Sequence, residues 1–385
     1  MIDSAGTIPQ RPIRIVHVIY RTKRGGGLQR VVFELLRGLD PARFEQYLVA
    51  YRREDPELDL TGIRLLPTTS VTDARQWRQQ RRFAHEVARH VRQNSIDIVH
   101  CHITRHTRWL MLRSRLAGAR FIRTLHITLQ KPETRFGLVA RFWNRLASAT
   151  TVCGPALVPG VARAWGLRQD EVTVVTNGID LDRFSVHGAR REETRRALGL
   201  RPDDIFLFSM GRLEEVKRHD VQIRAMAEVR KTLPNCRLLI AGTGRLEESL
   251  RALIRELGLD GNVTLLGNRD DVPELLDACD IFTLSTRLEG LPLSVIEAMA
   301  ARRPVVVTAA EGMEQVVEDG VTGLIVPVGD AAAFASAVLR LARDPGMRRR
   351  LGEAGRARAE REFSLAAMLD RYARLYESVM AGRAR

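Results

Sequence analysis

Short apolar runs rich in β-branched residues recur along the whole chain, and most of them alternate with segments of helical periodicity. A strand followed by a helix, repeated many times, is typical of parallel sheets that carry helices on both faces. The strand-like runs are residues 14–20, 47–51, 63–67, 96–102, 121–127, 150–154, 172–178, 205–211, 237–244, 263–267, 281–285, 304–309 and 323–328. About thirteen strands exceed one comfortable open sheet. The sequence therefore predicts an α/β fold with two doubly wound, Rossmann-like parallel-sheet domains.

The length of the chain, 385 residues, also favours two domains over one. We expect an N-terminal domain over residues 1–180 and a C-terminal domain over residues 181–360, followed by a terminal helical segment, 361–385. The stretch 179–203 is charged and rich in turn residues, which indicates a linker. Because ligands of doubly wound sheets bind outside the carboxyl ends of the strands, we expect the site in a cleft between the two domains.

The net charge of +15 is concentrated in the first half of the chain. Residues 1–185 contain 30 Lys and Arg against 16 Asp and Glu, whereas the remainder contains 31 against 30. Residues 101–150 alone hold ten basic side chains and one acidic side chain. A general preference for arginine would raise both halves equally, so we interpret the excess as a basic surface that faces an anionic partner.

Several classes of protein are disfavoured by composition. No stretch approaches the ~20 apolar residues that span a bilayer, and the first twelve residues lack the apolar core of a signal peptide. We therefore expect a cytosolic protein. The four cysteines lie far apart without a CxxC pair, which indicates buried, reduced thiols: Cys101, Cys153, Cys236 and Cys279.

The segment GRLEEVK, residues 211–217, follows one predicted strand and precedes a helix. Gly211 lets a backbone approach a ligand closely, Arg212 can fork onto phosphate oxygens, and Lys217 adds a compact charge. Lysine is scarce here: only Lys23, Lys131, Lys217 and Lys231 occur. The alternative is a solvated turn with a salt bridge at the start of a helix.

The segment TRLEGLPLSVIEAMA, residues 286–300, contains two glutamates in an otherwise apolar run. We expect Glu289 in a loop and a helix from Leu293, with Pro292 at its first turn, where a missing N–H costs little. The helix start suits a phosphate or hydroxyl cluster. Glu297 can accept hydrogen bonds from a vicinal diol such as ribose. The alternative is a capping acid followed by a surface acid, but an acid on an apolar helix is costly without a partner.

Two weaker candidates lie in the first half of the chain. Gly26 and Gly27, within RTKRGGGLQRVV, can bring backbone amides close to a diphosphate, although glycine runs are often plain loops. His126, at the end of a predicted strand, can hydrogen-bond a sugar hydroxyl or stabilise charge at a reacting carbon. His100 and His102 share a strand face with metal-like spacing, but no carboxylate or further cysteine completes a ligand set, so we expect no metal.

These stretches together resemble the retaining glycosyltransferases of the GT-B fold, and most closely the bacterial family four. The resemblance covers residues 14–328 and is carried, in order, by GGLQRVV, VHCH, TLHIT, TNGIDLDRF, GRLEEVKRHD, AGTG, EGLPLSVIEAMA and EDGVTGLIVP. The C-terminal segment REFSLAAMLDRYARLYESV is similar to the family's last helix, which crosses back onto the first domain.

The resemblance implies a role for each candidate. Arg212, Lys217, Gly26 and Gly27 would bind the diphosphate of a nucleotide sugar, a UDP- or GDP-sugar, without a metal or other cofactor. Glu289 would face the sugar, and His126 would lie beside the anomeric centre. Glu297 would hold the ribose, and the backbone of Gly290, Leu291, Pro292 and Leu293 would contact the sugar and phosphates. The chemistry implied is transfer with retention, in which the leaving phosphate takes the proton.

Three residues depart from the family's pattern. Gln29 stands where a Glu usually follows the glycine pair, Arg218 replaces a frequent glycine, and Gln315 replaces a frequent Glu. We expect these differences to affect the identity of the sugar and the acceptor but not the class of reaction.

The acceptor is indicated only by charge. The stretches 75–93 and 131–145 interleave arginines with apolar residues, which suits an anionic membrane surface or a lipid-linked acceptor as well as an ordinary helix with an exposed Arg face. We expect a hexosyltransferase of lipopolysaccharide, capsule or exopolysaccharide synthesis, peripheral on the inner face of the cytoplasmic membrane. The alternatives are a GT-B epimerase or phosphorylase, or a nucleic-acid-binding protein, although no nucleic-acid-binding motif appears.

Overall fold

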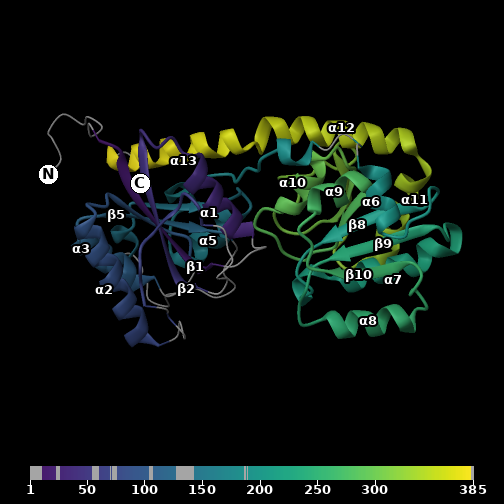
Figure 1. Ribbon diagram of the computed structural model, residues 1–385, viewed down its shortest axis with the longest axis horizontal. Coiled ribbons are helices and arrows are strands. Elements are labelled where there is room, and N and C mark those ends of the chain that lie inside the picture. The colour runs from purple at the N-terminus through teal and green to yellow at the C-terminus, as the bar shows by residue number, and fades with distance from the viewer. Residues whose placement is uncertain are drawn as a thin grey trace. The chain divides into compact units, whose positions relative to one another are not determined.

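The computed structural model describes residues 11–22, 27–53, 60–69, 71, 76–103, 107–126, 143–185, 188 and 190–382. The chain forms two compact units, each with its own sheet and helices (Figure 1). Unit 1 comprises Met1–Asn177 and Leu365–Arg385, and unit 2 comprises Gly178–Ser364. The sequence analysis placed these divisions at 180/181 and 360/361.

The sheet of unit 1 has seven parallel strands in the order β3-β2-β1-β4-β5-β6-β7. Their bounds are β1 Ile13–Thr22, β2 Phe44–Arg53, β3 Arg64–Leu65, β4 Ile98–Cys101, β5 Arg120–Leu125, β6 Ala149–Val152 and β7 Val172–Val174. The strand order reverses between β1 and β4, which are paired over Ile15–Val18. That reversal is the doubly wound arrangement expected from the sequence.

The helices described in unit 1 are α1 Gly27–Gly38, α2 Trp77–Gln93, α3 Arg108–Leu116, α5 Leu157–Trp165 and α13 Leu365–Met380. Helix α13 is the last helix of the chain, yet it belongs to unit 1. Its buried Tyr376 hydroxyl lies 2.8 Å from Nδ1 of His100 on β4. A second bond runs from Arg371 to the carbonyl of Thr176, 3.3 Å away. The terminal segment is therefore fixed to this unit by polar contacts as well as by packing.

The sheet of unit 2 has six parallel strands in the order β10-β9-β8-β11-β12-β13. Their bounds are β8 Ile205–Met210, β9 Cys236–Ala241, β10 Val263–Gly267, β11 Ile281–Leu284, β12 Val305–Thr308 and β13 Gly323–Val326. The helices are α6 Arg191–Ala197, α7 His219–Thr232, α8 Glu247–Glu256, α9 Val272–Ala278, α10 Leu293–Ala300, α11 Ala331–Arg343 and α12 Pro345–Glu362. Here the order reverses between β8 and β11.

All thirteen predicted strand runs form strands, and both sheets are parallel throughout. The reason is visible in their burial: four-residue strands such as β4, β11 and β12 are buried at every position, as expected when helices cover both faces of a parallel sheet. The prediction of two Rossmann-like α/β domains is confirmed.

The interpretation of residues 179–203 as a linker is wrong, because this stretch packs as part of unit 2. Ile179 and Phe184 are buried, and the amide of Ile179 donates to the carbonyl of Phe363. Helix α6 is fixed by its arginines: Arg191 Nη2 lies 2.5 Å from Asp280 Oδ1, and Arg195 is only 4% exposed. Arg191 and Arg195, which contributed to the appearance of a solvated linker, are instead hydrogen-bonded to backbone carbonyls and paired with Asp280.

The four cysteines, all within the described residues, are buried thiols outside any disulfide, as predicted. None of the helices in the described part of the chain combines the length and apolar character needed to cross a bilayer.

Candidate functional site

The candidate site of unit 2 lies where the strand order reverses, between β8 and β11. These strands are neighbours in the sheet, and the strand order reverses between them, which is the place where ligands of doubly wound sheets bind. Gly211–Lys217 follows β8, and the loop with Glu289 follows β11. The fold thereby brings together two segments more than seventy residues apart in sequence.

Lys217 and Glu289 form an ion pair at this point. Nζ of Lys217 lies 2.5 Å from Oε1 of Glu289, and their side chains are only 17% and 13% exposed. A partly buried cation needs a counter-charge, and here the protein supplies it. The two charges predicted to bind different parts of a ligand are thus paired with each other.

The backbone around Lys217 is fastened to the loop after β11 by several hydrogen bonds. The amide of Arg287 donates to the carbonyl of Val216 at 2.8 Å, and the hydroxyl of Thr286 lies 3.1 Å from the same oxygen. The hydroxyl of Ser285 donates to the carbonyl of Arg218 at 2.6 Å. Lys217, in the short 3-10 helix Glu215–Lys217, is therefore positioned by β11 as well as by β8.

Arg218 has a left-handed backbone, with φ 49° and ψ 40°. A side chain costs about 1–2 kcal/mol in the left-handed region, which agrees with the glycine that the resemblance leads us to expect at this position. The guanidinium of Arg218 makes two parallel bonds to the carboxylate of Asp220, each 3.0 Å long. Arg218 therefore adopts the left-handed backbone that the turn requires, and its guanidinium is paired with the carboxylate of Asp220.

The AGTG segment after β9 supports the loop after β8 through two glycines. A Cβ on Gly242 would lie 2.0 Å from the carbonyl oxygen of Gly211, and one on Gly244 would lie 2.4 Å from that of Leu213. Gly242 also has φ +143°. Only glycine allows the backbones to approach this closely, so the motif holds Gly211–Leu213 in place.

Gln315 supports the loop on the other side of the site. Its Nε2 donates to the carbonyl of Gly290 at 2.8 Å, and the neighbouring Gly312 lies so close that a Cβ would be 2.7 Å from the carbonyl of Glu289. A glutamate carboxylate cannot donate such a bond. The sequence analysis noted Gln315 only as a departure from the family's pattern, and its contact with Gly290 shows why the amide matters in this chain.

The helix after this loop, α10, begins at Leu293, with Pro292 at the N-cap position. Gly290, Leu291 and Pro292 are buried, and Glu297 is only 2% exposed. Glu297 therefore lies inside the unit and not on a solvated face. The guanidinium of Arg212, in contrast, belongs to an exposed residue for which the described part of the chain provides no ion pair.

His219, the first residue of α7, is a feature of this site that the sequence analysis missed. It is 2% exposed, and a Cβ on Gly211 would lie 3.7 Å from its Nε2. Burial, together with the charge of Lys217, lowers its pKa to about 4. A neutral imidazole therefore lies beneath the loop that carries Arg212. In the sequence, only its position directly after Lys217 and Arg218 indicated that His219 lies near the site.

Only some of the predicted site residues of unit 1 lie within the described residues. Gly27 is the first residue of α1, whereas Gly26 lies outside the described residues, as does most of the basic stretch 131–145. His126 directly follows β5 and is half-buried. Burial lowers the pKa of His126 to about 4.

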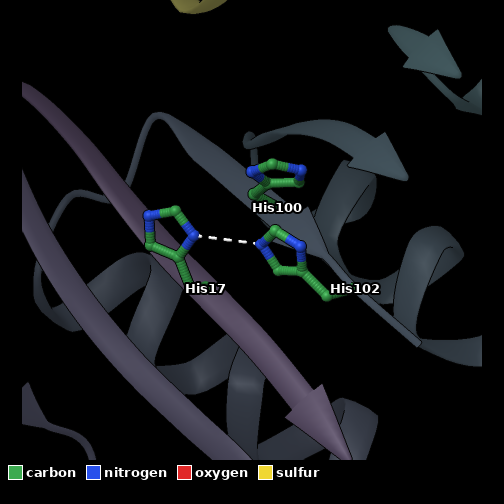
Figure 2. Close-up of side chains that lie close together, drawn as sticks. All are labelled: His17, His100 and His102. Atoms are coloured by element: carbon green, nitrogen blue, oxygen red, sulfur yellow. Dashed lines mark hydrogen bonds between the residues drawn. The ribbon is translucent and has the colours of Figure 1, made fainter. Parts of the chain in front are cut away.

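Unit 1 contains a cluster of three buried histidines, His17, His100 and His102 (Figure 2), and Nδ1 of His102 lies 3.5 Å from Nε2 of His126. Their ligand atoms lie within 4.8 Å of one another, a spacing compatible with a metal site. Both ring nitrogens of each, however, already have a hydrogen-bond partner. His17 comes from β1, so the sequence spacing around His100 and His102 gave no sign of it.

The comparisons with known proteins agree with this geometry. Residues 25–183 match the family model described as Glycosyltransferase Family 4, and residues 190–358 match the model of Glycosyl transferases group 1. The chain belongs to the group 1 glycosyltransferases. The two models together cover most of the chain, one for each sheet.

Among curated relatives, the lipopolysaccharide core biosynthesis glycosyltransferase LpsE of Rhizobium meliloti is 33% identical over 59% of this chain and 65% of its own length. The alpha-D-kanosaminyltransferase of Streptomyces kanamyceticus is 33% identical over 50% of each protein. The chain thus aligns with about half to two thirds of these relatives. A crystal structure of HepE from Anabaena in complex with UDP-glucose superposes with a TM-score of 0.81, at 20% identity, over 94% of this chain and 99% of HepE. This likeness supports the GT-B fold.

The contact between Gln315 and Gly290 predicts the effect of a single substitution. Gln315→Glu should weaken the binding of sugar nucleotides about fivefold, because two oxygens would face each other where the amide now donates a hydrogen bond worth about 1 kcal/mol. Isothermal titration with UDP-glucose and GDP-mannose measures the effect. Gln315→Met, which removes the donor without adding charge, should have a smaller effect. Unchanged binding in Gln315→Glu would show that this contact does not shape the site.

Proposed function

We propose that this glycosyltransferase moves a hexose from a nucleoside diphosphate sugar to a hydroxyl of an anionic or lipid-linked envelope glycan, with retention at the anomeric carbon. Unit 2 would bind the donor and unit 1 the acceptor. The observation that carries the proposal is the ion pair of Lys217 and Glu289 at the reversal point of the sheet of unit 2.

The residues around this ion pair suit a diphosphate. The Lys217 ammonium is a compact charge that can exchange a carboxylate for a phosphate oxygen. Arg212 adds an exposed guanidinium, and the unpaired N–H groups at the start of α10 add a partial positive charge. These groups supply positive charge of the kind that a divalent cation supplies in other enzymes, so we propose that the donor binds without a metal.

Arrival of the diphosphate would also release Glu289. Once Lys217 turns to a phosphate oxygen, the Glu289 carboxylate becomes available to accept hydrogen bonds from hydroxyls of the donor sugar. Glu297, deeper in α10, would bind the ribose. The ion pair thus keeps both side chains in place before the substrate binds, which reduces the cost of arranging them.

The reaction we propose needs no protein nucleophile. The bond from the anomeric carbon to the diphosphate oxygen breaks, a bond to the acceptor oxygen forms on the same face, and the acceptor's proton passes to the leaving phosphate. The products are a glycoside and a nucleoside diphosphate. Lys217, Arg212 and the start of α10 would stabilise the charge that develops on the leaving group.

The relatives support a donor and a pathway of this kind. HepE was crystallised with UDP-glucose, and LpsE is named for lipopolysaccharide core biosynthesis. We therefore place the acceptor of this chain among envelope polysaccharides and favour a UDP-sugar as donor. Membership of a glycosyltransferase family favours this reading over a nucleic-acid-binding role, which the basic charge alone would also suit.

The exposed face of α2 suits an anionic membrane surface. Its exposed residues include Trp77, Arg78, Arg81 and Arg89, and Trp77 itself is 54% exposed. The guanidinium groups of Arg78 and Arg81 lie 5.6 and 5.4 Å from the Trp77 ring. The only acidic residue of α2, Glu86, is hydrogen-bonded to Thr69. Arginines beside an exposed indole are suited to phosphate headgroups and the bilayer interface, so we propose peripheral association with the inner face of the cytoplasmic membrane through α2.

Removal of the Lys217 charge tests the donor site. A thermal-shift screen with UDP-, GDP- and ADP-sugars should identify a sugar nucleotide that stabilises the protein, by about 2.7 kcal/mol at a hundredfold excess over Kd. Lys217→Met should abolish this stabilisation and reduce sugar transfer at least about a hundredfold. Lys231→Met is the matched control, since Lys231 is exposed on α7 and pairs with Glu228. Normal binding and turnover in Lys217→Met would refute the site.

Substitution of arginines on α2 tests the membrane surface. The triple variant Arg78→Gln, Arg81→Gln and Arg89→Gln should sediment with phosphatidylglycerol vesicles about a hundredfold less strongly, at about 1 kcal/mol for each charge. Binding of the sugar nucleotide should not change. The control makes the same change in net charge on exposed residues of unit 2: Arg343→Gln, Arg349→Gln and Arg350→Gln. Equal losses in both triple variants would show that the attraction is not specific to α2.

A further inference from the structure

The buried histidines of unit 1 form a chain of hydrogen bonds that ends at His126. His17 Nε2 lies 3.1 Å from Gln46 Oε1, and His17 Nδ1 lies 3.2 Å from His102 Nε2. His102 Nδ1 in turn lies 3.5 Å from His126 Nε2. The chain therefore runs from β2 through β1 to the residues that follow β4 and β5.

The direction of this chain is fixed at Gln46. The Nε2 of Gln46 donates to the carbonyls of Leu35 and Leu36, at 2.9 and 3.3 Å, near the end of α1. An amide nitrogen must face these acceptors, so the amide oxygen faces His17. That oxygen can only accept, and the proton of His17 must therefore be on Nε2.

Each following proton is then determined in turn. With its proton on Nε2, neutral His17 offers Nδ1 as an acceptor, so His102 donates from Nε2. His102 then offers Nδ1, and His126 donates from its own Nε2. Nδ1 of His126 keeps an unshared lone pair, and no described residue hydrogen-bonds to it.

We propose that His17 and His102 are positioning residues that hold His126 in one orientation and one protonation form, with Nε2 committed to the protein and Nδ1 presented as a hydrogen-bond acceptor. This proposal rests on the proposed function for the presence of a donor sugar, and on the resemblance for the expectation that His126 lies beside its anomeric centre. An acceptor nitrogen receives a hydrogen bond from a hydroxyl, and it cannot donate one to a phosphate oxygen. The sequence left two roles open for His126. These hydrogen bonds favour a contact with a sugar hydroxyl over stabilisation of charge.

The surroundings keep the hydrogen-bonded histidines neutral. His17 and His102 are at most 1% exposed. Burial lowers the pKa of His17 to about 4 and that of His102 well below its ordinary value, and the neighbouring histidines lower the pKa of His102 further. The hydroxyl of Tyr376 and that of Thr124 face the cluster through His100. The groups identified around these rings are thus neutral at pH 7.

His100 belongs to a separate chain, which provides an internal control. Thr151 lies 3.5 Å from the carbonyl of Arg123, to which it donates, so Thr124 donates to Thr151 at 2.6 Å. Thr124 must then accept from Nε2 of His100, which leaves Nδ1 to accept from Tyr376. Tyr376→Phe therefore removes a buried hydrogen bond from the same cluster without touching the chain that ends at His126.

The test is NMR of the full-length protein with ¹⁵N-labelled histidine, in which the ring couplings show which nitrogen carries the proton. The chain has nine histidines, and His126→Ala assigns the signal of interest. We expect His126 to be neutral at pH 7, protonated at Nε2, with slow exchange of that proton with water. Protonation at Nδ1, a charged ring, or rapid exchange would overturn the proposal before His17 or His102 is changed.

Two variants of His102, with Tyr376→Phe as the control, test its role as a positioning residue. His102→Met should speed the exchange of the His126 Nε2 proton and raise the Kd for UDP-glucose about tenfold, whereas His102→Gln, whose amide can both accept and donate, should restore much of the affinity. Tyr376→Phe should leave both readouts unchanged. Wild-type exchange in His102→Met, or an equal loss of affinity in Tyr376→Phe, would refute the proposal.

The outcome is distinguishable from failure of the proposed function. If no sugar nucleotide binds the wild-type protein, the proposed function fails while the NMR result still decides the protonation of His126. If UDP-glucose binds but His126 carries its proton on Nδ1, the proposed function stands and the positioning roles of His17 and His102 fall. Added Zn²⁺ should leave the histidine signals unchanged, and their shift on its addition would show that the cluster is a metal site.

Discussion

The ion pair of Lys217 and Glu289 is the interaction on which the candidate site of unit 2 depends. Parallel strands place their following loops at one edge of the sheet, and the reversal of strand order between β8 and β11 separates those loops. A lysine from one loop and a glutamate from the other then meet at 2.5 Å in a mostly buried position. The glycines of AGTG, the hydroxyls of Ser285 and Thr286 and the amide of Gln315 all fix the backbone on either side of this pair.

In unit 1, the side chains at the reversal of strand order are neutral. Its reversal point lies between β1 and β4, and the side chains there are histidines that bond to one another in defined directions. Charged groups at the same depth would each require a partner, whereas neutral imidazoles can serve as donor and acceptor at once. The two units therefore present different chemistry: a charged pair suited to a diphosphate in unit 2, and an uncharged acceptor at His126 in unit 1.

The fold could be read from the sequence because buried parallel strands have a strong local signature. The runs at 205–211 and 281–285 are continuous and apolar, and both became strands. The positions of Lys217 and Glu289 after two strands could also be predicted, but their mutual ion pair could not, because strand order decides which loops meet. The stretch 179–203 was misread since composition does not show whether an arginine such as Arg195 faces water or a carbonyl. His17 was missed because it contacts His102 only across neighbouring strands.

The most direct test of the central claim is a crystal structure of the full-length protein with UDP bound. We predict that Lys217 will have left Glu289 and will lie, with Arg212, within hydrogen-bonding distance of the diphosphate, while the ribose hydroxyls contact Glu297. If UDP instead binds away from these residues, or if Lys217 stays paired with Glu289 and makes no contact with a phosphate, then the ion pair is a structural feature and the donor site lies elsewhere.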